Sequence, residues 1–212
     1  MSFQKDEFVQ RIRTLPKSHQ IVFAAGCAER LIPIYQSFEI LEGWGDCAKL
    51  RRGLDFVWES VDAAVLDTPL IETFSRDIEE LIPDADDFQD IYVFGAQYAA
   101  ISIIYSLSLL RAANPETVYQ VSKACTETTH AFASEVNDPR VDLHAVHPGF
   151  ENWIDSSPLY RAEVQKQLND LELLEGTPIL NNSFLKEYRR DSTSFGISPL
   201  ARGLLNDSGT IE

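Results

Sequence analysis

Glu127 and His130 have a spacing that suits metal binding. They are three residues apart in the segment Glu127-Thr-Thr-His130, so both side chains would project from one face of a helix. Di-iron helical bundles use two Glu-x-x-His motifs of this kind together with two further glutamates. The sequence contains one such motif, and a single short match in an acidic protein is expected by chance. A surface or core-edge pair is therefore the preferred interpretation, and a metal site is the alternative.

A second candidate metal site contains His144 and His147, with Asp142 and Glu151 close by in the sequence. Imidazole and carboxylate groups are ligands of zinc and iron. These residues fall in the segment 137–155, which is the longest stretch without helical periodicity and is unusually long for a connection in a bundle. Because histidines on a loop have no fixed mutual geometry, packing of the loop is preferred over a metal site. No cofactor is expected.

The third group of polar residues is Glu29, Arg30 and Asp55. Glu29 and Arg30 are the only charged residues between Gln20 and Ile34. A buried charge without a partner costs several kcal/mol, so we expect both side chains to form ion pairs. Arg30 is predicted to bind a carboxylate on a neighbouring helix, with Asp55 as the leading candidate. Glu29 lies about 100° away around the helix and should have another partner.

This group has two interpretations. An inter-helix salt bridge between the predicted second and third helices is the preferred one, and a polar pocket for a small ligand is the alternative. Asp55 also lies four residues after Arg51, so these two side chains could pair on the helix surface.

Motifs of several other enzyme classes are missing from the sequence. There is no Gly-x-Ser-x-Gly motif for a serine nucleophile, and the ten glycines are too scattered to form a phosphate-binding loop. The three cysteines, Cys27, Cys47 and Cys125, are far apart, and Cys27 and Cys125 lie in apolar segments. We expect reduced, partly buried thiols. The first residues contain no apolar signal segment, so a cytoplasmic location is expected.

The net charge of −15 bounds the possible partners. A nucleic-acid backbone and an anionic membrane surface both require clustered Lys and Arg, so neither is expected as a partner. An acidic surface favours solubility and would suit a basic protein partner. A homo-oligomer remains open.

Helical periodicity runs through most of the chain, and it predicts a single all-α domain over residues 1–212. The expected bundle has about seven or eight helices with mostly antiparallel neighbours. Ser18, Asp46 and Thr68 are the expected N-caps of the second, third and fourth helices, and Pro33 predicts a kink in the second. Residues 192–212 are expected to form a partly mobile tail. The predicted helices are 2–14, 19–41, 47–65, 69–82, 88–112, 115–136, 158–174 and a last one ending near Arg190.

The predicted helix 88–112 has two interpretations. From Ile91 to Leu110 the sequence holds no charged residue, which is about the length that crosses a bilayer. However, serines, tyrosines and Gln97 are spread along this segment, and no basic cluster flanks it to set an orientation. A central core helix is therefore preferred, and no membrane insertion is expected.

Two neighbouring motifs resemble a known family. The segment from Cys27 to Pro33 has the pattern Cys-x-Glu-Arg-Leu-x-Pro, and Gly-Trp-Gly-Asp follows at residues 43–46. Together they resemble the bacterial YjaG-like family, the domain-of-unknown-function family 416, from the Leu15-Pro16 turn to the helix around Val121. The resemblance implies an all-helical fold. Through gene-neighbourhood associations it also implies a link with histidine kinases and signalling, but it assigns no functional residue.

These observations lead to two candidate functions. The first is a non-catalytic cytoplasmic protein with a binding or regulatory role, which acts through a surface of the bundle and is associated with signalling. The second is a metal-dependent enzyme with a site near His130, His144 and His147. The sequence predicts no catalytic residue and identifies no substrate.

Overall fold

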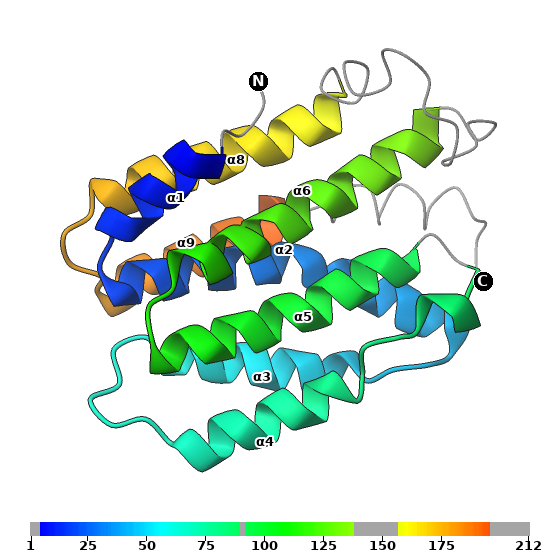
Figure 1. The fold of residues 1–212 in the computed structure, drawn as a ribbon, viewed down its shortest axis with the longest axis horizontal. Helices are drawn as coiled ribbons and strands as arrows, with labels where there is room; N and C mark the ends of the chain where they lie inside the picture. Colours follow the sequence, from blue (N-terminus) through cyan, green and yellow to red (C-terminus); the bar gives the residue numbers. More distant parts are fainter. Residues whose placement is uncertain (1–4, 90–91, 138–156, 196–212) are drawn as a thin grey trace.

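The computed structural model is an all-α bundle, as the periodicity predicts (Figure 1). It describes all residues except 1–4, 90–91, 138–156 and 196–212. The described part contains eight α-helices, one short 3-10 helix and no strand. The helices are α1 (Lys5–Thr14), α2 (Lys17–Glu42), α3 (Cys47–Glu59), α4 (Thr68–Glu79), α5 (Tyr92–Arg111), α6 (Pro115–Asn137), α8 (Pro158–Glu175) and α9 (Asn182–Phe195), with the 3-10 helix η1 at Ala85–Asp87.

Helix α2 is the centre of the bundle. It contacts α3, α5, α6, α8 and α9, and every residue from His19 to Ile32 is buried. Burial on all sides explains why the segment from His19 to Ile32 carries only two charged residues, Glu29 and Arg30. Pro33 does not interrupt the helix, which continues over 26 residues, and Ser37 donates a hydrogen bond to the carbonyl of Pro33 over 3.0 Å.

Two of the three predicted N-caps are wrong by a short distance. Helix α2 follows Pro16 and begins at Lys17, so Ser18 lies inside its first turn. The cap of α4 is Asp67, one residue before Thr68, and its carboxylate accepts the Leu70 N–H over 2.9 Å. Asp46 caps α3 as predicted and accepts the Lys49 N–H over 2.8 Å. At α4, Asp67 and Thr68 are neighbouring residues that compete for one cap position. At α2, the residue at the cap position is Pro16, which makes no side-chain cap hydrogen bond.

Several helix boundaries also differ from the prediction, and α4 ends at Glu79 rather than at residue 82. Helix α3 ends at Glu59, where Ser60 closes its last turn, rather than at residue 65. Helix α5 begins at Tyr92 because the preceding Phe88 has an extended backbone. Helix α9 continues to Phe195, so it includes the first residues of the predicted tail.

Helix α5 packs against α2, α3, α4 and α6. Its mean hydropathy of 1.6 would allow it to cross a membrane by length and composition, but 61% of the apolar segment is buried inside the bundle. Gly95 permits close packing, since a Cβ atom there would lie 2.5 Å from Ile34 Cγ2 and 3.2 Å from Thr128 Cγ2. These contacts match the core-helix interpretation of this segment.

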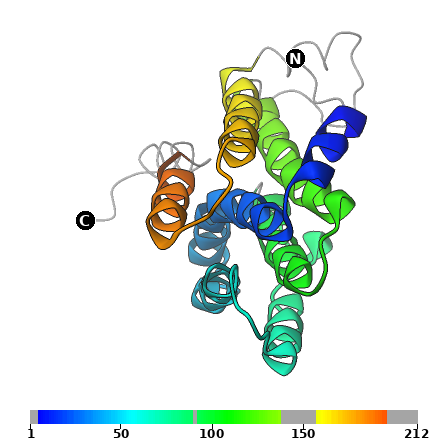
Figure 2. The same cartoon turned by 90° about the vertical axis from the view of Figure 1, so that its left-hand side faces the viewer.

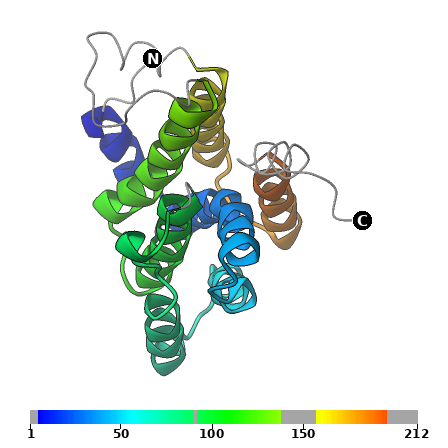
Figure 3. The ribbon, with the colours of Figure 1, turned by 90° about the vertical axis from the view of Figure 1, so that its right-hand side faces the viewer.

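Helix α9 lies on the outside of the bundle against α2, and views from the two sides agree on this position (Figures 2 and 3). Ion pairs join it to α3 on one side of α2 and to α8 on the other. Helix α9 therefore covers the part of α2 that carries Glu29 and Arg30.

Candidate functional site

Arg30 is completely buried, and its guanidinium binds two carboxylates of α8. Nη2 lies 2.9 Å from Glu163 Oε1, and Nη1 lies 3.2 Å from Asp170 Oδ2. The remaining contacts are the Gly26 carbonyl at 3.3 Å and Cys27 Sγ at 3.2 Å. Burial alone would lower the pKa of Arg30, but the attraction of the carboxylates outweighs it and holds the pKa well above its usual value.

The two carboxylates are themselves held by buried polar side chains. Gln167 donates to Glu163 over 2.7 Å and to the Ser122 carbonyl of α6 over 3.1 Å. Lys166 forms an ion pair with Asp170 and a second one, of 2.9 Å, with Asp191 of α9. This Arg30 network therefore joins α2, α6, α8 and α9.

Glu29 is also fully buried but binds residues on a different side of α2. Its carboxylate pairs with Arg51 and accepts the indole N–H of Trp58 over 3.0 Å, and both partners belong to α3. Arg189 of α9 binds the same carboxylate over 2.7 Å and also pairs with Asp55. This Glu29 network joins α2, α3 and α9.

The predicted pairing of Arg30 with Asp55 is wrong. Arg30 does bind carboxylates of a neighbouring helix, but that helix is α8, and Asp55 binds Arg189 instead. The predicted pairing of Arg51 with Asp55 is wrong as well, because Arg51 binds Glu29. The reason is geometric. The α3 residues face Glu29, and Arg30 points about 100° away around α2.

The arrangement of these charges suits a structural role. Glu29 and Arg30 are both at 0% exposure, and each cation of the two networks contacts at least one carboxylate. In the Glu29 network, solvent reaches only the edge, where the side chains of Arg51, Arg189 and Asp55 are 32%, 32% and 39% exposed. The two networks therefore act between helices, where they fix how α3, α8 and α9 lie on α2.

The candidate metal ligands Glu127 and His130 are not part of these two networks. Glu127 is largely exposed on α6 and lies 4.0 Å from Lys123, and His130 is half-buried on the same helix. Within the described part of the chain, no group of three or more His, Cys, Asp and Glu side chains could hold a metal ion. His144 and His147 lie outside the described residues, so the predicted alternative that includes them stays a prediction.

The thiols of Cys27 and Cys125 lie beside the Arg30 network. Both residues are buried and free, and Cys125 Sγ donates to the Cys27 carbonyl over 3.3 Å. Burial, followed by the contact with Cys27, holds the pKa of Cys125 well above its usual value. Burial also raises the pKa of Cys47 to about 11. The raised pKa values make the thiols of Cys125 and Cys47 poor nucleophiles at neutral pH.

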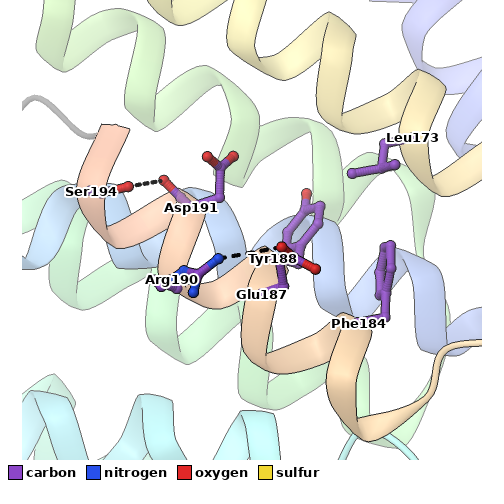
Figure 4. Close-up of a pocket in the computed structure, with 7 residues that line it drawn as sticks. All are labelled: Leu173, Phe184, Glu187, Tyr188, Arg190, Asp191 and Ser194. Carbon is purple, nitrogen blue, oxygen red and sulfur yellow. Dashed lines mark hydrogen bonds and ion pairs between the residues drawn. The ribbon is translucent and has the colours of Figure 1, made fainter.

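A surface pocket of about 400 Å³ lies between α8 and α9 (Figure 4). The side chains that line it come mostly from α9, and Leu173 of α8 forms the facing wall. No sequence motif pointed to this site, because its residues become neighbours only when α9 packs beside α8. Its lining residues are Leu173, Phe184, Glu187, Tyr188, Arg190, Asp191 and Ser194.

The sequence matches a family of known proteins over most of its length. Residues 7–201 match the family described as "Protein of unknown function (DUF416)", and the chain belongs to this family, as its motifs predicted. It is 30% identical over 176 residues to the uncharacterized protein YjaG of Escherichia coli K12, with 78% of this chain and 86% of that protein covered. The uncharacterized protein YjaG of Salmonella typhimurium is 29% identical over 177 residues, with the same shares covered.

A solved structure shares the fold. The crystal structure of a DUF416 family protein from Shewanella baltica OS155 superposes with a TM-score of 0.78 at 24% sequence identity. The match covers 90% of this chain and 95% of that chain. The helical arrangement described above is therefore also found in an experimental structure.

Proposed function

We propose that this protein is a non-catalytic binding or regulatory protein of the cytoplasm, which acts through a surface of its helical bundle. The observation that carries the proposal is the pairing of the buried charges. Glu29 and Arg30, for which a polar ligand pocket was the alternative interpretation, are sealed in ion pairs between helices. An accessible pocket lies instead on the outer surface between α8 and α9.

The proposed context is signalling, and the proposed partner is a protein of a histidine kinase pathway. This part of the proposal rests on the association that the family resemblance implies. The net charge of −15 also supports a protein partner with a basic surface, because such a surface would be attracted over a distance. Nucleic acid and membrane are left out of the proposal for the same electrostatic reason.

The test begins with co-purification of the protein, tagged at its own chromosomal locus, followed by mass spectrometry. A candidate partner is then purified and titrated into this protein by calorimetry. Saturable binding of the purified partner, with no chemical change in either protein, would support the proposal.

Elemental analysis of the same preparation checks the enzyme alternative. Stoichiometric iron, zinc or manganese that is lost in His130→Ala, His144→Ala or His147→Ala would overturn the non-catalytic proposal. It would favour a metal-dependent enzyme instead.

A further inference from the structure

The α8–α9 pocket has an apolar side. Leu173 is 48% exposed although it is a large apolar residue, and it faces Phe184 and Tyr188 of α9 (Figure 4). The two aromatic rings are one helical turn apart, with centroids separated by 5.8 Å. Such a surface can cover the methylene groups of a long side chain. The ring of Tyr188 is itself buried at 3% exposure, and Lys166 lies over it at 5.6 Å, so Leu173 and Phe184 form the accessible apolar surface.

Two carboxylates stand at the rim of this apolar surface. The side chain of Glu187 is 72% exposed, and its contact with Arg190 is an exposed pair with a distance of 3.3 Å. A pair of this kind contributes little, so an incoming cation could displace Arg190. The side chain of Asp191 is 63% exposed and uses Oδ2 to bind Lys166. Because a carboxylate has about four acceptor positions, Asp191 can bind a second cation without releasing Lys166.

We infer that this pocket binds a basic polypeptide segment by taking up a Lys or Arg side chain. The methylene groups of that side chain lie on Leu173 and Phe184, and its charged end meets Glu187 and Asp191. This inference rests on the proposed binding function and names the chemistry of the partner.

The charges favour a cation over an anion as the occupant. Arg190 is the exposed cation of the lining, and the ammonium group of Lys166 is buried beneath the pocket. An anionic segment would be repelled over a distance by the net charge of −15, and at the pocket it would meet two exposed carboxylates beside the single cation Arg190. A basic segment is attracted at both distances.

The experiment compares two double variants with the same change of charge. Leu173→Lys with Glu187→Lys places positive charge in the pocket. Leu41→Lys with Glu42→Lys makes the same substitutions at exposed positions in the last turn of α2, where Leu41 is 49% exposed. Binding of a fluorescent oligolysine peptide with blocked ends is measured by anisotropy at about 0.15 M salt, where long-range attraction is largely screened. An oligoglutamate peptide serves as the negative probe.

We expect the pocket variant to bind oligolysine about tenfold more weakly than the unmodified protein, and the α2 variant to stay within about threefold. Circular dichroism checks that both variants are folded. If the pocket variant does not fold, the milder Glu187→Gln should still weaken binding relative to Glu42→Gln.

Four results would overturn the inference. Equal weakening in both double variants would mean that the peptide responds to net charge alone. Lack of oligolysine binding by the unmodified protein would also reject it. A dimer, seen by light scattering, that dissociates only in the pocket variant would assign the pocket to self-association. If a purified natural partner binds the pocket variant unchanged, the inference fails while the proposed binding function stands.

Discussion

Glu29 and Arg30 are neighbours in the sequence, yet they bind residues of different helices. Glu29 meets α3 and α9, and Arg30 meets α8. Adjacent residues of an α-helix point about 100° apart, so one acid–base couple can serve two sides of a central helix. Both side chains are sealed from solvent, which makes each of them dependent on its partners.

The ion pair between Asp55 and Arg189 is partly exposed, so its contribution to the free energy of unfolding should be smaller than that of a buried pair. The side chain of Asp55 is 39% exposed, and that of its partner Arg189 is 32% exposed. Asp55→Ala leaves Arg189 bound to Glu29, so we expect the free energy of unfolding in urea to fall by about 1 kcal/mol or less. A loss near 3 kcal/mol, as for a fully buried pair, would contradict the assignment of Asp55 to the half-exposed edge of the network.

The three cysteines should differ in how they react with iodoacetamide. The pKa of Cys47 is about 11, so its thiolate fraction at pH 8 is on the order of 0.001. Its labelling rate in the native protein should rise about tenfold per pH unit from 8 toward 11. Cys27 and Cys125 are fully buried and should be labelled only after denaturant is added. Fast native labelling of either one, followed by mass spectrometry of peptides, would contradict that burial.

At the scale of helices, periodicity predicted most of the fold because apolar residues recur at helical spacing along each buried face. The prediction of α2 as a core helix is confirmed. The segment from Gln20 to Ile34 holds only one acid and one base, so nearly all its side chains are apolar and pack against other helices. Helix ends were less predictable. Asp67 and Thr68 are both good caps, and only the path of the chain decides between them.

The partners of Arg30 could not be predicted in the same way. Glu163 lies 133 residues further along the chain, in a helix rich in Glu and Gln. That composition is typical of a solvated surface. In the structure, Glu163, Gln167 and Asp170 instead share one buried face of α8, with the spacing i, i+4, i+7. This spacing of polar residues is the one feature of the sequence that could have identified the partners of Arg30. It indicates a buried polar face only when a buried cation is known to lie opposite.

Gly95 should be essential for the approach of α5 to α2. A Cβ atom there would lie 2.5 Å from the branched side chain of Ile34 and close to Thr128, and neither group is the end of a flexible chain. We expect Gly95→Ala to destabilise the protein by about 1–3 kcal/mol in urea unfolding, despite the better helix propensity of alanine.

Gly176→Ala is the matched control for this change. Its added Cβ would meet only ordinary contacts of 3.4 Å and 3.7 Å, and its backbone at the end of α8 has φ −81°. Its effect should stay within about 0.5 kcal/mol. Equal effects of the two substitutions would show that helix packing at Gly95 is looser than the structure indicates.

For the whole molecule, the packing of its most apolar helix determines whether the protein is found in solution or in the membrane fraction. Helix α5 has the hydropathy of a membrane span, but other helices cover most of it. We expect the protein to stay in the supernatant after high-speed centrifugation of a lysate without detergent. Recovery in the membrane pellet, released only by detergent, would show that α5 leaves the bundle to enter a bilayer.

The two ends of the described chain are held together by charge. The Arg30 network links α2 to α8 across more than a hundred residues of sequence, and Arg189 and Asp191 attach α9 to the same core. These buried charges therefore fix how α3, α8 and α9 lie on α2.

A double-mutant cycle on Arg30 and Glu163 tests this claim most directly. Glu163→Leu removes the closest partner of a completely buried guanidinium, so we expect a loss of about 3 kcal/mol in urea unfolding, and Arg30→Met should cost a similar amount. The double variant should lose at least about 2 kcal/mol less than the sum of the two single losses. Additivity within about 0.5 kcal/mol would mean that the two side chains do not depend on each other, and it would contradict the structural role assigned to them.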